Sequence, residues 1–181
     1  MITSGWLREM VFYAQQPEIG AVGAKLLYPD GTVQHGGVIL GIGGVAGHAH
    51  KYLAADDPGY FCRAMLPQSF SAVTGACLLV EKGIFKQVDG LDEELVVAFN
   101  DVDLCLKFQE SGFRNIWTPY AQLYHHESKT RGYEDTSEKK ERFRREVLFM
   151  QNKWKYLLVN DAYYNKNLTK EREDFSLSSV R

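Results

Sequence analysis

Apolar residues recur at helical spacing in four stretches of the chain. The spacing predicts helices over residues 5–16, 82–87, 101–111 and 138–159. Ser4 can cap the first helix, and Gly112 ends the third. Asp135 can cap the last helix, with Glu138 completing a capping box. The last helix has a single apolar stripe, which must pack on the rest of the fold. Its members are Phe143, Val147, Met150, Trp154 and Leu157.

Shorter apolar runs predict strands between these helices. They cover residues 21–28, 33–40, 73–80, 113–117 and 122–125. Pro29-Asp30-Gly31 has the chemistry of a turn, because proline presets φ and glycine accepts a positive φ, so residues 21–40 are expected to form a hairpin. The uncharged, glycine-rich run 41–47 predicts a flexible loop, and residues 160–181 predict a polar tail.

Together these elements predict a single α/β domain over residues 1–181, with a mixed sheet flanked by helices. Hydrophobic residues make up 45% and charged residues 24% of the chain, as in globular proteins. The net charge of −2 offers no electrostatic attraction for nucleic acid. No apolar run reaches the roughly 18 residues of a membrane span, and no signal-peptide pattern opens the chain. The cysteines have no metal-binding spacing and are expected to be reduced thiols of a cytoplasmic protein. They are Cys62, Cys77 and Cys105.

Acidic and amide side chains gather at the predicted start of the 101–111 helix. They are Asn100, Asp101 and Asp103. A carboxylate can act as a general base that takes the proton of an attacking hydroxyl group. The alternative is structural, because asparagine caps helices well and acids in the first turn complement the helix dipole. The spacing alone leaves both interpretations open.

Two further segments are candidates for chemistry. His125 and His126 end a predicted strand, where side chains alternate between faces, so at most one of them faces a given site. A neutral imidazole there can bind Mn²⁺ or be a buried, hydrogen-bonded histidine. Thr74-Gly75-Ala76 interrupts an apolar run, which predicts either a bulge approached by a ligand or tight packing on a neighbouring strand. His48 and His50 lie in a glycine-rich setting and are expected in a loop.

An ordered set of motifs along the chain resembles the family-2 glycosyltransferases of the GT-A fold, particularly bacterial enzymes that build surface polysaccharides. The resemblance covers about residues 3–175, and it is the order of the motifs that makes it specific. The motifs are Gly5-Trp6-Leu7, the run from Val22 to Gly37, the run from Thr74 to Val80, Gly90-Leu91-Asp92-Glu93, Asn100-Asp101-Val102-Asp103 and Tyr124-His125.

The resemblance implies a partial GT-A domain of the nucleotide-diphospho-sugar transferase type and a role for each candidate residue. Asp101 matches the catalytic base, and Asn100 stands where the family has a glutamate. Asp103 looks like a helper or structural acid. The segment 74–76 resembles the strand under the donor sugar and the acceptor, and His125 matches a metal ligand of some relatives. The implied reaction is inverting transfer from a nucleotide-sugar to a glycan, with Mn²⁺ or Mg²⁺ on the leaving diphosphate.

The chain departs from the family at its start. It contains no nucleotide-binding half and no Asp-x-Asp motif before Ile2-Thr3-Ser4. The expectation is therefore the acceptor-side half of a cytoplasmic enzyme, at the inner face of the membrane, which is inactive alone and forms homo-oligomers through exposed apolar surface. Two alternatives stay open. One is a non-enzymatic carbohydrate-binding or assembly module, and the other is a metal-dependent hydrolase that uses Asp101, Asp103 and the histidines.

Overall fold

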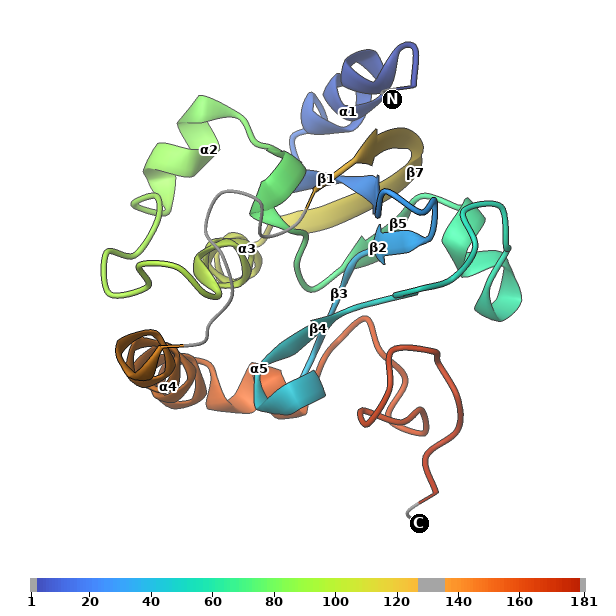
Figure 1. Cartoon of the computed structure of the whole chain (residues 1–181). Coiled ribbons are helices and arrows are strands. Elements are labelled where there is room, and N and C mark those ends of the chain that lie inside the picture. The colour runs from blue at the N-terminus through green and yellow to red at the C-terminus, as the bar shows by residue number, and fades with distance from the viewer. Residues whose placement is uncertain (1–2, 127–135, 180–181) are drawn as a thin grey trace.

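The computed structural model describes residues 3–126 and 136–179, which form a curled mixed sheet flanked by helices (Figure 1). The helices are α1 (Trp6–Ala14), α2 (Lys82–Gln87), α3 (Asn100–Glu110), α4 (Ser137–Lys153) and α5 (Lys155–Val159). The strands are β1 (Ile19–Leu27), β2 (Val33–His35), β3 (Val38–Leu40), β4 (Ala46–His48), β5 (Gln68–Phe70), β6 (Leu78–Leu79) and β7 (Arg114–Tyr124). Short 3₁₀ turns cover Ile42–Gly44, Tyr60–Met65 and Gly75–Cys77.

The main sheet is mixed, as the sequence predicts. β1 and β7 run parallel at its centre, β5 is antiparallel to β7, and β2 and β6 are both antiparallel to β1. β3 and β4 form a separate two-stranded sheet. This α/β architecture confirms the predicted fold class and is compatible with part of a nucleotide-sugar transferase-like domain.

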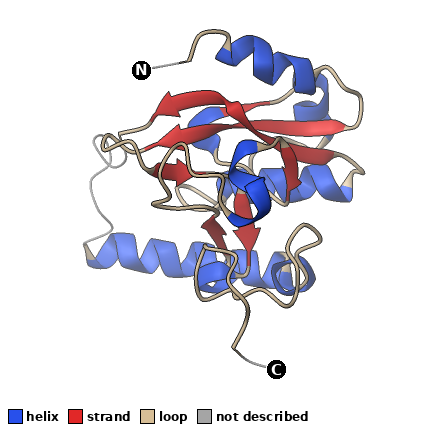
Figure 2. Ribbon diagram, turned by 90° about the vertical axis from the view of Figure 1, so that its right-hand side faces the viewer, coloured by secondary structure: helices blue, strands red, loops and turns tan. Residues whose placement is uncertain are grey.

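Helices cover both faces of the main sheet (Figure 2). α1 packs on one face over a small cluster that includes Met10, Val22 and Ile116. α3 packs on the other face, and α4 lies beyond it, so the larger core is on this side. Every residue of β1 is buried, as expected for a central strand that is covered on both faces.

The predicted hairpin is present, but its second strand is shorter than predicted. Asp30 accepts hydrogen bonds from the amide and hydroxyl of Thr32, and Gly31 has a φ of 86°. The chain then leaves the main sheet at Gly37, whose φ is 102° and where a Cβ would overlap the ring of Phe70. Residues 38–40 pair instead with β4, which occupies part of the predicted 41–47 loop.

Two other strand predictions need correction. The 73–80 run forms only the short strand β6, because Gly75 opens a 3₁₀ turn. Residues 113–125 do not split at Pro119 but form the single strand β7. Thr118 pairs with Ala24 and Gln122 with the next residue of β1, so the proline lies in a bulge, where its missing N–H costs no ladder bond.

The predicted helices are present, with different ends. Gly5 precedes α1 with a φ of 80° and no side-chain cap, so the predicted Ser4 cap is wrong. Thr136 caps α4 by accepting from the amide of Lys139, whereas the predicted cap Asp135 lies outside the described residues. The 138–159 helix is interrupted at Trp154, which separates α4 from α5.

The C-terminal segment is part of the core and not a polar tail. Phe175 is 2% exposed and stacks on His50 at 4.7 Å between ring centroids. Asp161 accepts hydrogen bonds from the amide of Leu40 and the hydroxyl of Ser71. These contacts join residues more than 80 positions apart, which local spacing cannot reveal.

The structure bears on three other expectations. All three cysteines are free, with Cys105 buried and Cys62 exposed. None of the helices in the described parts of the chain is long and apolar enough to cross a membrane. Large exposed apolar side chains include Phe12, Phe61 and Tyr156. Self-association through such surface stays a prediction.

Candidate functional site

The first turn of α3 meets the 74–76 turn, although the two are 26 residues apart in the sequence. Asp101 accepts a hydrogen bond from the Gly75 amide at 2.7 Å through Oδ2 and one from its neighbour Val102 at 2.8 Å through Oδ1. Gly75 is exposed and Asp101 is half-buried. The structure therefore brings together two predicted segments, with a carboxylate at the surface between them.

Local geometry explains why these two segments fit together. Thr74 has an extended backbone, and its hydroxyl accepts from the amide of Ala76, which opens the 3₁₀ turn. A Cβ at Gly75 would lie 3.3 Å from the Cβ of Asp101, which is a tight approach. The glycine thus allows its backbone to reach the carboxylate. Asn100, half-buried, is the first residue of α3 and precedes this contact.

A histidine pair lies directly behind the 74–76 turn. The Thr74 amide points to Nε2 of His35 at 3.4 Å, and Nδ1 of His35 lies 2.7 Å from Nδ1 of His48. Burial, together with the nearby His48, lowers the pKa of His35 well below its ordinary value, so its ring is neutral. Because Nε2 of His35 accepts a hydrogen bond from Thr74, its Nδ1 carries the hydrogen and donates a hydrogen bond to Nδ1 of His48. His48 belongs to β4, which corrects the predicted loop.

Asp103 has a different environment from Asp101. Its carboxylate is fully buried, accepts from the Trp154 indole at 2.7 Å and pairs with Lys153 at 2.8 Å. Lys107 lies 3.8 Å away on the next turn of α3. Asp103 therefore joins α3 to the junction of α4 and α5. Of the two roles that the resemblance implies for it, helper acid or structural acid, this geometry favours the structural one.

His125 follows β7 and is held from two sides. Its amide donates to the carbonyl of Leu27 at 2.9 Å, and its Nδ1 lies 2.8 Å from Oε1 of Gln34. Gln34 and His35 are neighbours on β2, so their side chains point to opposite faces. His125 is thus on the face of β2 opposite the histidine pair. No side-chain hydrogen bond among the described residues joins His125 and Gln34 to Asp101, the 74–76 turn or the histidine pair.

The fit of a divalent ion can be tested on these residues. A metal-binding histidine commonly has its other ring nitrogen held by an oxygen, and Gln34 holds Nδ1 of His125 in this way. Within residues 3–126 and 136–179, however, no group of three or more His, Cys, Asp or Glu residues is placed to hold a metal. The described residues therefore offer one oriented imidazole and not a complete site.

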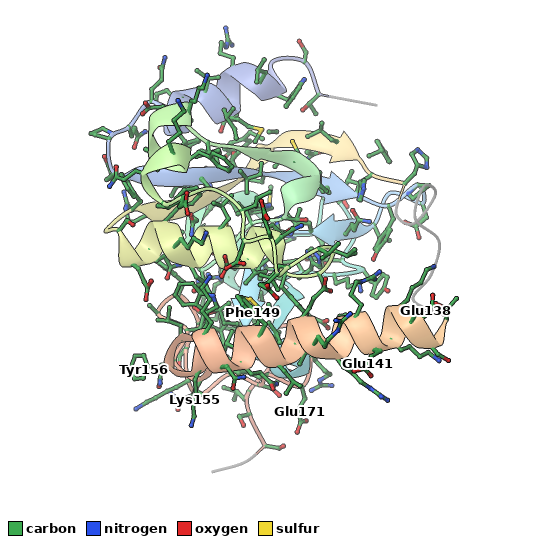
Figure 3. The ribbon with its side chains drawn as sticks, turned by 90° about the vertical axis from the view of Figure 1, so that its left-hand side faces the viewer. Glu138, Glu141, Phe149, Lys155, Tyr156 and Glu171 are labelled. Carbon is green, nitrogen blue, oxygen red and sulfur yellow. The ribbon has the colours of Figure 1, made fainter. Side chains whose placement is uncertain are left out.

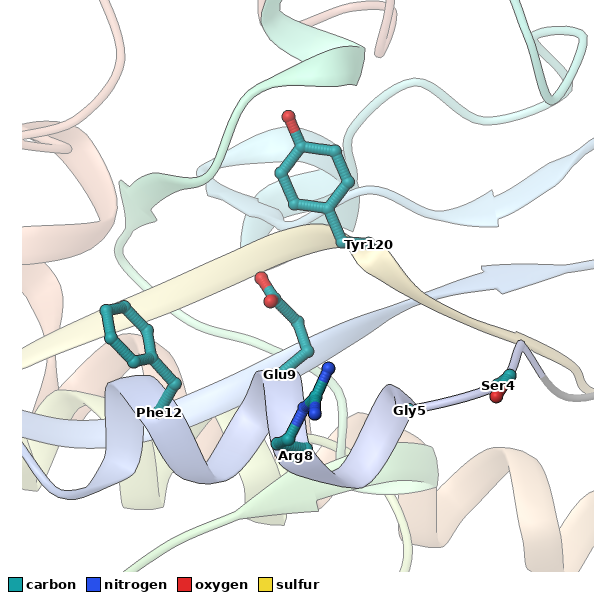
Figure 4. A pocket seen from close by; sticks show the side chains of 6 residues that line it. All are labelled: Ser4, Gly5, Arg8, Glu9, Phe12 and Tyr120. Carbon is teal, nitrogen blue, oxygen red and sulfur yellow. The ribbon is translucent and has the colours of Figure 1, made fainter.

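A shallow pocket lies beside α1, away from Asp101. Glu9 points from α1 toward β7, which carries Tyr120 (Figure 4), and accepts from the hydroxyl of Thr118 at 2.8 Å. The residues that line the pocket are Ser4, Gly5, Arg8, Glu9, Phe12 and Tyr120. α1 and α3 cover opposite faces of the sheet, so this pocket is not part of the Asp101 site.

No protein-family model matches the chain. Its sequence is similar to several curated proteins. A protein of Sinorhizobium fredii named "Uncharacterized protein y4gI" is 57% identical over the whole chain, which covers 20% of that protein. "O-antigen biosynthesis protein RfbC" of Myxococcus xanthus is 39% identical over 72% of the chain and 10% of that protein.

A third relative is matched over a shorter segment. "N-acetylglucosaminyl-diphospho-decaprenol L-rhamnosyltransferase" of Mycobacterium tuberculosis is 34% identical over 36% of the chain and 21% of that protein. The chain thus spans about a fifth or less of the length of the curated relatives it matches. Two of the three are named for polysaccharide biosynthesis or glycosyl transfer, and these partial similarities point to a glycosyltransferase-like family.

Proposed function

We propose that the chain forms the acceptor-side half of an inverting glycosyltransferase that transfers a sugar from a nucleotide-sugar to a glycan in surface-polysaccharide synthesis. The observation that carries this proposal is the contact between Asp101 and Gly75, which places an oriented carboxylate at an exposed turn. The proposal includes a nucleotide-binding half, with an Asp-x-Asp motif, in a longer protein, because the chain spans about a fifth or less of the curated relatives it matches. The names of the relatives support glycosyl transfer as the general activity.

Asp101 is the general base in this proposal. Each of its oxygens accepts one backbone N–H and keeps a further lone pair, so the carboxylate can still accept the proton of an acceptor hydroxyl. As that proton moves to Asp101, the hydroxyl oxygen bonds to the anomeric carbon and the bond to the nucleoside diphosphate breaks. The two amides hold the carboxylate still, which reduces the reorganisation needed during transfer.

The neighbouring polar groups bind the substrates. In the sequence, Thr74 precedes Gly75 and Asn100 precedes Asp101. The Thr74 hydroxyl and the Asn100 side-chain amide can hydrogen-bond to sugar hydroxyls, while Gly75 and Ala76 let the sugar approach the backbone. His125 would be one ligand of a divalent ion, Mn²⁺ or Mg²⁺, with the other ligands coming from the nucleotide-binding half. When bound, such an ion neutralises charge on the leaving diphosphate.

The test compares the longer protein with the 181-residue chain. Each is incubated with a panel of nucleotide-sugars and bacterial glycan acceptors, and release of nucleoside diphosphate and glycan extension are measured. The proposal predicts both products from the longer protein and neither from the chain alone. Glycan binding by both proteins without any transfer would favour a carbohydrate-binding module instead. Free sugar released by the chain alone would favour a hydrolase.

A further inference from the structure

Glu146 of α4 is buried and binds the backbone just before α3. It is 2% exposed, and its Oε1 and Oε2 accept from the amides of Val97 at 2.9 Å and Ala98 at 3.1 Å. Arg142, one turn earlier, lies 3.8 Å from the same carboxylate. Hydrogen bonds to an ionised carboxylate are among the strong ones, so two of them to successive amides fix this stretch of backbone.

The backbone that Glu146 holds needs such support. Phe99 has a φ of 63°, a conformation that residues other than glycine rarely adopt, and it directly precedes α3. Its ring packs on Phe143 of α4, with 5.6 Å between ring centroids. A strained residue of this kind persists only where its surroundings determine it. α4 supplies those surroundings through one carboxylate and one aromatic ring.

Only two residues separate Ala98 from Asp101, so the direction of the 97–99 backbone sets where α3 begins. α4 also contacts α3 at a second point, because Lys153 and Trp154 at its end bind the Asp103 carboxylate. Figure 3 shows α4 extended along this side of the molecule. With two contacts from one rigid helix, the first turn of α3 has little freedom to rotate or slide.

We propose that Glu146 is a positioning residue that holds Asp101 against Gly75 by fixing the backbone of Val97 and Ala98. Its catalytic meaning rests on the proposed function, whereas the positioning itself is a property of the chain alone. The simpler alternative is that Glu146 only attaches α4 to the protein. In that case its loss would loosen α4 and the 97–98 amides but leave the contact between Asp101 and Gly75 unchanged.

The experiment follows the Gly75 amide by NMR in the 181-residue chain, so it needs no substrate. The test variant is Glu146→Gln, which keeps the size of the side chain but replaces one accepting oxygen by an NH₂ group. The matched control is Glu141→Gln on the same helix (Figure 3), whose side chain is 64% exposed beside Arg144. The Val22 amide in buried β1 reports global unfolding.

In Glu146→Gln we expect the resonance of the Gly75 amide proton to shift and this proton to exchange with solvent about tenfold faster. The exchange rate of the Val22 amide should change far less. Glu141→Gln should leave both amides as in the parent chain. Loss of protection at residues 97 and 98 with an unchanged Gly75 would overturn the proposal. Equal acceleration at Gly75 and Val22 would also overturn it, because that result describes a general loss of stability. A failed transfer assay would refute the proposed function, but it would not affect the exchange rates of the Gly75 and Val22 amides by which the positioning role of Glu146 is judged.

Discussion

The two faces of α3 carry the same residue type in different environments. Asp101 faces the exposed 74–76 turn and accepts from two backbone amides, whereas Asp103 is fully buried and bound by Trp154 and Lys153. Residues two positions apart in an α-helix, such as Asp101 and Asp103, lie about 200° apart around the helix axis. Their side chains must therefore point in different directions. The first turn of α3 thus holds both a candidate base and the acid that fixes the position of this helix.

Removing the buried acid should have the largest effect on stability. Asp103→Ala leaves the Trp154 indole without its carboxylate inside the protein, whereas the partly exposed Lys153 keeps its ion pair with Asp92. We expect the free energy of unfolding in urea to fall by about 3 kcal/mol, because a hydrogen bond to a charged group contributes about 1.5–3 kcal/mol and the partly exposed pairing with Lys153 adds less. Glu110→Ala, at the exposed end of the same helix, is the control. Equal losses in the two variants would remove the distinction between the two faces.

Acid should destabilise the chain through His50, which is buried beside Phe175. Burial, aided by Arg63, lowers the pKa of His50 from 6.5 to about 4. Because protonation is harder in the folded state, stability is complete above pH 6.5 and declines as the pH falls toward 4. The total loss from this residue is about 3 kcal/mol. Urea unfolding from pH 7 to 4 measures it, and His50→Gln should flatten the curve. An unchanged slope in that variant would contradict the assignment.

The single hydrogen bond from Trp154 to Asp103 should have a smaller effect. Trp154→Phe keeps an aromatic ring at the junction of α4 and α5 but removes the indole N–H. A hydrogen bond to a charged group contributes about 1.5–3 kcal/mol, and we expect a loss of unfolding free energy in that range. Trp6→Phe on α1, on the other side of the sheet, is the control. A loss no larger than in the control would mean that Lys153 and Lys107 secure Asp103 without the indole.

Much of the fold follows from local patterns. The stripe on the last helix is confirmed at Met150 and Trp154, which are buried, and the turn at residues 29–31 forms as its residue types require. Patterns failed where a distant contact decides the conformation. Gly37 turns the chain out of the sheet because Phe70 occupies the space beside it, and Phe175 is buried by contacts with residues far away in sequence.

The site was predictable in its parts but not in its assembly. The sequence marks the 74–76 turn and the start of α3, yet only the fold shows that Gly75 touches Asp101. His35 was missed, although a histidine inside the predicted 33–40 strand is a signal of a buried polar contact. Glu146 was missed because a glutamate among charged neighbours on a helix is expected to face solvent.

The assignment of Asp101 as the general base is tested by the turnover of Asp101→Asn in the longer protein, with the unfolding free energy of the same variant measured in the chain. The account predicts a rate loss of about 10²–10⁴-fold, as is typical when a general base is removed. We expect a stability loss of about 1–2 kcal/mol, because the amide side chain keeps one accepting oxygen for the two backbone amides and loses the favourable interaction with the helix dipole. Near-normal turnover in Asp101→Asn would show that this carboxylate is a second structural acid and would contradict the account.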